Sequence, residues 1–236
     1  MVNIERLDDR KIAIVKLPNR DMDQSIQWAF EDLCNSISQD PEVRVVILTS
    51  EAPDFVSSPL TNQFGLASSV SAIKQPVLGV IDKSAHGLGL ELVLACDVRI
   101  CSMKSEFSMT HVTHGLIPSD GGTQRLPRVV GQGRALEIIL TARLVKAREA
   151  FEIGMIHKLS DNDPLKDAYC VAEKIATYGP TATQYLKEAI YTGADMTLRQ
   201  GMNLEADMSF ILQSTQDRTE GINSFLEKRT PDFKGD

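Results

Sequence analysis

Residues 75–102 read QPVLGVIDKSAHGLGLELVLACDVRICS, and this stretch decides the fold class. Its first eight residues form an apolar, branched run that predicts a buried strand, and residues 97–102 predict another. Between them the chain stays apolar after Gly87 and Gly89, which predicts a helix that begins near Leu90. Because a strand, a helix and a strand in this order form a crossover unit, we expect parallel strands in a layered α/β fold.

The same alternation extends to both sides of this unit. Further strands are predicted at residues 11–18, 43–50 and 155–160, and helices at 24–39, 133–143 and 147–154. Residues 51–74 form a Ser/Pro/Gly-containing loop with room for a short helix. From Pro164 onward every signal is helical, with predicted helices at 164–179, 180–193, 197–214 and 220–229. We therefore predict a core domain over residues 1–178, which holds the active site, and a helical region over residues 179–236.

Composition narrows the class of protein. The 236 residues are 42% hydrophobic and 24% charged, which is typical of a soluble globular protein. The net charge of -7 argues against a nucleic-acid partner, although a few basic side chains can still bind an anionic small molecule. No apolar run approaches the roughly 18 residues of a membrane span, and the polar start MVNIERLDDRK lacks the apolar centre of a signal peptide. We expect a cytoplasmic protein.

The cysteines do not indicate a metal site. There are four, at positions 34, 96, 101 and 170, with no CxxC pair and no histidine at ligand spacing. We expect buried free thiols in a reducing compartment.

The Gly-Leu-Gly turn before the central helix is a candidate oxyanion site. Gly87 and Gly89 allow the backbone to approach a ligand closely, and N–H groups at a helix start stabilise negative charge. The alternative is that these glycines only permit tight packing of helix on sheet. Glu91 follows in the first helical turn, where a carboxylate is favoured by the helix dipole or serves as a partly buried acid or base.

The loop HVTHGLIPSDGGTQRLP, residues 111–127, contains a second candidate group. His111 is a candidate general acid or base if a nearby Asp fixes its tautomer, and Asp120 is the carboxylate of the loop. The alternative for Asp120 is that it caps the next helix. His114 is expected to be structural or exposed, and His86 to line the glycine turn.

Several stretches together resemble one known family. They are VRVVILTS, QPVLGVIDKSAHGLGLELVLACDVRICSMKSEFSM, GLIPSDGGTQRLPRVVG, ALEIILTARLVKAREAFEIGMIHKL and FLEKRTPDFKG. In this order they resemble the crotonase superfamily, the enoyl-CoA hydratases and isomerases, over nearly the whole chain.

The resemblance implies a ββα-spiral core and a C-terminal helical region used in trimerisation, giving a homotrimer or a dimer of trimers. It also implies acyl-CoA thioester substrates whose carbonyl oxygen is held by two backbone N–H groups while an enolate forms. Coenzyme A would enter as part of the substrate, and neither a metal nor a redox cofactor is implied.

The resemblance implies roles for individual residues of this sequence. The second oxyanion N–H falls on Leu88, within the turn of Gly87 and Gly89, and Glu91 matches one of the two catalytic glutamates of the hydratases. The second glutamate is replaced by His111, so ordinary water addition by two glutamates is not assured.

The residues at positions 111 and 120 also resemble those of another branch of the superfamily. Asp120 falls where some isomerases place their single catalytic glutamate. His111 and Asp120 together match a His and an Asp of the 6-oxocamphor hydrolases, which cleave a C–C bond in β-diketones.

The first oxyanion N–H and the coenzyme contacts are less regular. Pro59 occupies the position of the first oxyanion residue and has no N–H, so Ser58 would have to supply it through a shift of one residue. Coenzyme A contacts are implied for Arg20, Phe225 and Lys228.

Three functions remain open from the sequence. The first is an acyl-CoA-processing hydratase or isomerase that works through a thioester enolate. The second is a C–C hydrolase that acts on a β-diketone or a β-keto thioester. The third is a catalytically weak relative that binds CoA esters.

Overall fold

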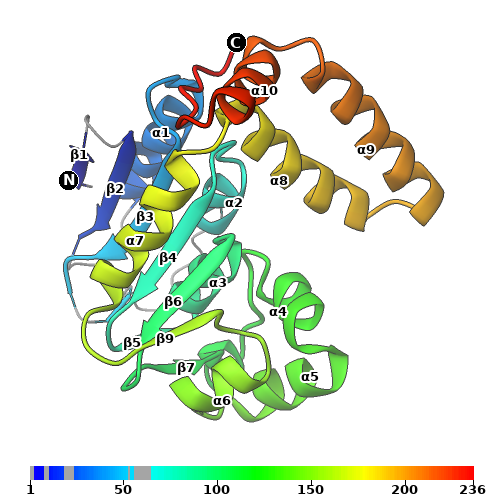
Figure 1. The fold of residues 1–236 in the computed structure, drawn as a ribbon. Helices are drawn as coiled ribbons and strands as arrows, with labels where there is room; N and C mark the ends of the chain where they lie inside the picture. Colours follow the sequence, from blue (N-terminus) through cyan, green and yellow to red (C-terminus); the bar gives the residue numbers. More distant parts are fainter. Residues whose placement is uncertain (1–2, 8–10, 19–23, 53, 56–64) are drawn as a thin grey trace.

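A mainly parallel sheet forms the centre of the computed structural model, which describes residues 3–7, 11–18, 24–52, 54–55 and 65–236 (Figure 1). Within these residues the sheet has six strands in the order β1-β2-β3-β4-β6-β9. β1 pairs antiparallel with β2, and every other pair is parallel. The strands are β1 (Asn3–Leu7), β2 (Ile12–Leu17), β3 (Val45–Ser50), β4 (Val77–Ile81), β6 (Val98–Ser102) and β9 (Lys158–Ser160). The predicted α/β fold is confirmed.

The sheet is buried on both faces, as its continuous apolar strands predict. Because side chains alternate along a strand, Val45 and Ile47 of β3 face one side while Val46 and Leu48 face the other. The first side is covered by α7 (Pro164–Ala176), whose Ala168 belongs to the same apolar cluster as Val45.

Three helices cover the other face of the sheet (Figure 1). They are α1 (Gln24–Gln39), α2 (Leu66–Ser71) and α3 (Leu88–Ala95). α1 has the predicted bounds and buries Ile26, Phe30 and Ile37 at helical spacing. α3 connects the parallel strands β4 and β6, as expected of a crossover unit, and all its residues after Leu88 are buried.

A small second sheet brings the chain that leads into residues 111–127 close to the start of α3. Its strands are β5 (Ser84–His86), β7 (Glu106–Ser108) and β8 (Val145–Lys146). The N–H of Gly87 donates to the carbonyl of Ser108 at 2.9 Å, so the chain after β7 passes close to the glycine turn. The segments that follow are the 3-10 helix η2 (Thr110–His114), α4 (Gly122–Val130), α5 (Gln132–Thr141) and α6 (Ala147–Glu152).

The C-terminal helices are α8 (Pro180–Ala194), α9 (Leu198–Leu212) and α10 (Gln216–Glu227). α8 and α9 extend away from the sheet as a pair (Figure 1). The pair approaches closely near its turn, because a Cβ added to Gly201 would lie 3.6 Å from the Cα of Gly193. The predicted division between residues 178 and 179 falls between α7 and α8, and it stays a prediction.

Two basic side chains attach the C-terminal region to the core. Lys187 of α8 forms an ion pair with Asp97 at 2.8 Å, and the same carboxylate oxygen accepts the N–H of Val77 at the start of β4. The guanidinium of Arg44, beside β3, donates to the carbonyls of Ala176 and Phe233. These contacts hold α8, the end of α7 and the C-terminal segment against one edge of the core.

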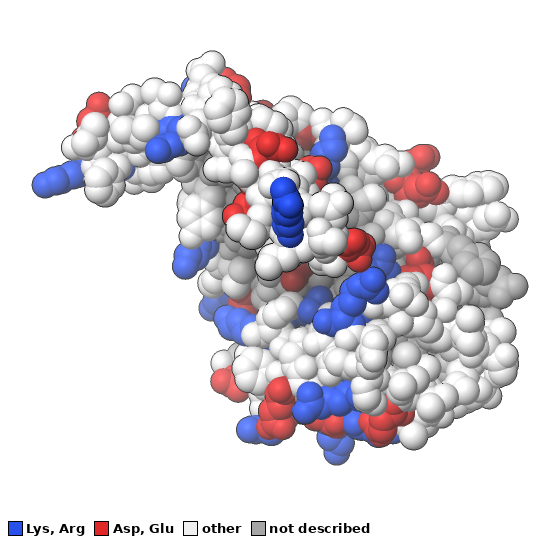
Figure 2. Space-filling model, turned by 90° about the vertical axis from the view of Figure 1, so that its right-hand side faces the viewer, with Lys and Arg blue, Asp and Glu red and all other residues white. Residues whose placement is uncertain are grey.

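Basic and acidic side chains are mixed on the described surface. On the face that Figure 2 shows, Lys and Arg stand singly or in small groups among acidic and uncharged side chains. Among the helices of the described part of the chain, none is long and apolar enough to cross a membrane.

Candidate active site

Glu91 is placed by the tight turn at the start of α3. Gly87 precedes the helix with φ 52° and ψ -119°, a backbone conformation that favours glycine. The helix therefore begins at Leu88, two residues before the predicted start, and Glu91 falls in its first turn. The Glu91 side chain is 0% exposed, so this carboxylate depends on protein groups for its stability.

The two oxygens of the Glu91 carboxylate have different environments. Oε1 accepts the backbone N–H groups of Asp120 and Gly122, each at 2.8 Å. Oε2 lies 3.3 Å from Nε2 of His111 and has no aligned hydrogen bond among the described residues. Burial raises the pKa of Glu91, but the His111 imidazole and the two N–H groups outweigh it, so the net pKa is lowered. The carboxylate is thus held ionised.

His111 is brought to Glu91 by the short helix η2. The histidine is 4% exposed, and its Nε2 faces the carboxylate. Its Nδ1 is buried without a hydrogen-bond partner among the described residues. Such a buried, unpartnered nitrogen is unusual in a folded protein and is often found at a functional site.

The sequence predicted that Asp120 orients His111, but the carboxylate of Asp120 has other partners in the structure. Its carboxylate accepts the N–H of Ala67 at 2.5 Å, and the N–H and hydroxyl of Ser68 at 3.3 and 3.1 Å. It therefore satisfies the N-terminus of α2, whose own preceding residue provides no side-chain cap. It also does not cap α4, which is preceded by Gly121. The carboxylate beside His111 is that of Glu91.

The turn of Gly87, Leu88 and Gly89 lies at the start of α3, and its role as an oxyanion site stays a prediction. Leu88 is the first residue of α3, so its backbone N–H has no acceptor within the helix. Gly87 and Gly89 are buried beside it, and their predicted contact with substrate stays a prediction. Ser58, Pro59 and Arg20 lie outside the described residues.

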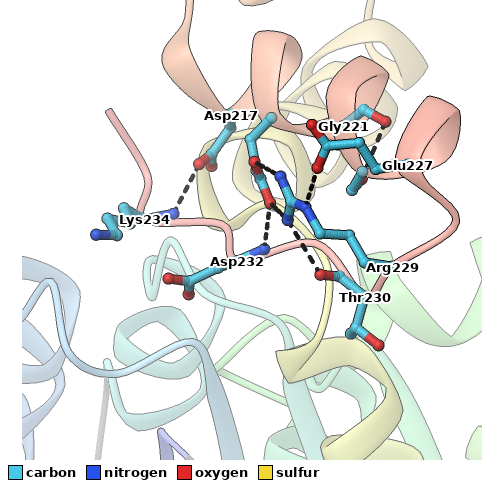
Figure 3. Close-up of polar contacts among 9 residues, drawn as sticks. Asp217, Gly221, Glu227, Arg229, Thr230, Asp232 and Lys234 are labelled. Atoms are coloured by element: carbon cyan, nitrogen blue, oxygen red, sulfur yellow. Dashed lines mark hydrogen bonds and ion pairs between the residues drawn. The ribbon is translucent and has the colours of Figure 1, made fainter.

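Phe225 and Lys228, the predicted coenzyme contacts, are both exposed. Phe225 is 82% exposed on α10, and Lys228 ends that helix in a left-handed conformation with φ 56°. Arg229 stabilises the chain just after α10. Its guanidinium forms ion pairs with Glu220 at 2.5 Å and Glu227 at 2.6 Å (Figure 3). These contacts order the segment, and the predicted coenzyme role stays a prediction.

The other histidines lie apart from the buried pair. His114 is exposed, as predicted. His86 lies next to the glycine turn, with Nδ1 2.8 Å from the Ser108 hydroxyl, and burial lowers its pKa. His157 accepts the backbone N–H of Arg99 at 3.0 Å, so it joins β9 to β6.

The cysteines largely follow the expectation. Burial raises the pKa of the thiols of Cys34, Cys96 and Cys101 to about 12. Cys170 is the exception, because it lies on the outer side of α7 and is exposed. No cluster of three or more His, Cys, Asp or Glu side chains suited to a metal ion occurs within the ranges that the structure describes.

Sequence reasoning missed the groups that hold Glu91. The backbone N–H groups of Asp120 and Gly122 belong to a loop that is distant in sequence. The only local signal was the Gly-Gly pair. A Cβ on Gly122 would lie 3.0 Å from Glu91 Oε1 and 2.8 Å from Pro118 Cβ, so the close approach requires glycine there.

Comparison with known proteins identifies the family of the chain. The family model described as Enoyl-CoA hydratase/isomerase matches residues 56–236. The chain is 32% identical over 211 residues to the 2,3-dehydroadipyl-CoA hydratase of Escherichia coli, covering 83% of each protein. It is also 32% identical over 221 residues to the crotonyl-CoA hydratase of Syntrophomonas wolfei, covering 86% of this chain and 85% of the relative.

A solved structure has the same fold over its full length. The crystal structure of an enoyl-CoA hydratase from Bacillus anthracis superposes with a TM-score of 0.93 at 32% identity, covering 100% of this chain and 99% of that one. The sequence match and the superposition both include α3, the His111 loop and the C-terminal helices. The chain therefore belongs to the enoyl-CoA hydratase/isomerase family.

Proposed function

We propose that the protein adds water to an enoyl-CoA thioester through an enolate, with His111 and Glu91 transferring the proton. The observation that supports this most directly is the buried pair of His111 Nε2 and Glu91 Oε2 at 3.3 Å, with Glu91 on the helix whose first residue is Leu88. Family membership and the names of the relatives support a CoA thioester as substrate.

One proton carrier is enough for this reaction. The His111–Glu91 pair takes a proton from water, and the hydroxyl adds to C3 of the enoyl group. The electrons of the C2–C3 double bond move to the thioester oxygen, which becomes an enolate beside the Leu88 N–H. The enolate then collapses as the pair returns the proton to C2, so water has been added in total. Without water, removal of a C2 proton from a 3-enoyl thioester and its return to C4 would be an isomerisation.

The substrate class is tested with three compounds. The purified protein is offered crotonyl-CoA, a 3-enoyl-CoA and a cyclic β-diketone, and each product is followed by mass spectrometry. We expect hydration of crotonyl-CoA and a loss on the order of 10²–10⁴-fold in kcat for His111→Gln. His114→Gln is the control and should retain full activity, because that histidine is exposed.

Other outcomes would separate the alternatives. Turnover of the diketone alone would refute the proposal and favour C–C hydrolysis. That alternative has the weaker support, because the carboxylate of Asp120 is bound to α2 and not to His111. Tight binding of CoA esters without any turnover would favour a catalytically weak relative.

The role of the Leu88 N–H has its own test. Proline lacks the N–H but is tolerated at the first position of a helix, which Leu88 occupies. Leu88→Pro should therefore keep α3 and lower kcat by about 10²–10³-fold, the usual effect of removing one oxyanion donor. Leu88→Ala keeps the N–H and is the control. Equal activity of the two variants would exclude this N–H from the reaction.

We also propose that the protein assembles as a homotrimer or a dimer of trimers. Large apolar side chains are exposed on the C-terminal helices, which is unusual for a monomer's surface. They include Leu186, Ile190, Leu198, Met202, Phe210 and Phe225. Sedimentation equilibrium should give three or six times the 26.0 kDa mass of the chain, and a monomer at micromolar concentration would contradict this.

A further inference from the structure

We propose that His111 Nδ1 is the atom that exchanges the proton with substrate, and that Glu91 is a positioning residue that acts through His111. This inference rests on the proposed function and assigns different roles to the two groups. In the hydratases that the chain resembles, two glutamates share the proton transfers. Here one group would transfer the proton and the other would fix its geometry.

The contact with Glu91 determines which nitrogen of His111 bears the hydrogen. An ionised carboxylate can only accept hydrogen bonds, and Nε2 lies 3.3 Å from Glu91 Oε2. A lone pair on Nε2 would face the carboxylate oxygen and repel it, so Nε2 bears the hydrogen. In the neutral imidazole the lone pair is then on Nδ1.

The two ring nitrogens of His111 differ in their polar neighbours. Nε2 faces Glu91 Oε2 at 3.3 Å, although the two are not aligned as a hydrogen bond, whereas Nδ1 is buried without a hydrogen-bond partner among the described residues. A buried acceptor left unpaired is costly unless a water or a ligand completes it. Nδ1 is therefore the ring nitrogen whose hydrogen-bonding capacity is unused, and we assign the proton exchange to it.

Backbone hydrogen bonds hold Glu91 in its place. Its Oε1 accepts two backbone N–H groups at 2.8 Å, which fixes the carboxylate and directs Oε2 at the imidazole. The same role is played by the aspartate of a Ser-His-Asp triad, which orients histidine and stabilises its protonated form without becoming protonated itself.

This arrangement predicts a distinctive effect of Glu91→Gln. The two N–H groups of Asp120 and Gly122 require an oxygen at Oε1, so the new amide nitrogen must take the position of Oε2. That nitrogen donates to His111 Nε2, which then cannot bear a hydrogen. The ring proton moves to Nδ1, and the proposed base is lost.

Nitrogen-15 NMR of histidine-labelled protein tests this without any substrate. The chemical shifts distinguish a protonated ring nitrogen from an unprotonated one, and His111→Gln identifies the His111 signals. We expect protonated Nε2 in the wild type and protonated Nδ1 in Glu91→Gln, with His114→Gln as an unchanged control. Protonated Nδ1 in the wild type, or the same tautomer in both proteins, would overturn the proposal.

Kinetics supply an independent test on crotonyl-CoA. Glu91→Gln should lower kcat by about 10²–10⁴-fold with little change in KM. If Glu91 acts only through His111, the double variant should be no slower than His111→Gln alone. Losses that multiply in the double variant would mean that Glu91 exchanges protons independently, and would overturn the proposal. If no thioester is turned over, the hydration proposal fails while the NMR result still decides the tautomer.

Discussion

Substituting Gly122 by alanine tests whether close backbone contact holds the active-site carboxylate. The new Cβ would lie 2.8 Å from Pro118 Cβ, and 3.0 Å from both Glu91 Oε1 and Met109 Cε. Gly122 is buried, so these neighbours must move, and the N–H that binds Glu91 moves with them. The variant therefore disturbs the packing and the carboxylate anchor together.

The expected loss of stability follows from two opposing effects. Overpacking costs about 1–3 kcal/mol, and a hydrogen bond to a charged group contributes about 1.5–3 kcal/mol, part of which is lost on displacement. Alanine recovers less than the roughly 0.5–1 kcal/mol that it gains in a helix interior, because Gly122 is the first residue of α4. The net loss should be about 1–3 kcal/mol. For a chain of this length each kcal/mol changes the Tm by about 2–4 °C.

Circular dichroism at a fixed protomer concentration measures the effect, because the Tm of an oligomer depends on concentration. Gly133→Ala is a matched control. Gly133 lies exposed in α5, and an added Cβ would meet no atom within 4 Å. We expect Gly133→Ala to raise the Tm slightly and Gly122→Ala to lower it by several degrees. A Tm for Gly122→Ala at or above that of the wild type would refute the packing argument.

Four further outcomes are expected. Because the folded-state pKa of Glu91 is lowered, its contribution to stability is complete above the unfolded value of about 4.3 and is lost as pH falls through the folded pKa. The Tm advantage of the wild type over Glu91→Gln, followed by calorimetry between pH 7 and 3, should shrink only at the acidic end, and a constant difference would contradict this. Lys187→Met should cost about 3 kcal/mol in urea unfolding, since it leaves Asp97 without its buried cation, and adding Asp97→Asn should recover part of the loss. A chromogenic disulfide reagent should react quickly with one thiol per chain, and Cys170→Ser should abolish that fast phase. His111→Glu should change the pH profile of crotonyl-CoA hydration, because it restores two carboxylates to the site, and an unchanged profile would exclude residue 111 from the proton transfers.

The strands and long helices could be predicted because their burial follows from local pattern. α1 was predicted from its apolar spacing and from the Asp40-Pro41 pair that ends it, and β3 from its branched run. The short strands β5 and β8 were not predicted, because two or three residues show no periodicity and depend on pairing with β7. β1 was also missed, because it adds to the edge of the sheet by pairing with β2.

The residues of the candidate site could be named from the sequence, but their contacts could not be predicted. The family resemblance identified Glu91 and His111, and the structure brings them together. Neither sequence interpretation of Asp120, a partner of His111 or a cap of the following helix, identified its contact with α2, more than fifty residues earlier. Tertiary packing decides such a contact. The exposure of Cys170 was missed for the same reason, since it depends on which side of α7 faces the sheet.

The two backbone N–H groups that hold Glu91 have a consequence for how this scaffold changes its chemistry. They belong to the main chain of residues 120 and 122, so no side-chain substitution at residue 111 removes them. In the proposed mechanism, the backbone therefore holds the Glu91 carboxylate in place, and the side chain at residue 111 is its partner. A change between glutamate and histidine at residue 111 would leave both backbone donors to Glu91 in the chain. Divergence of reaction type then requires neither a new loop nor a new fold.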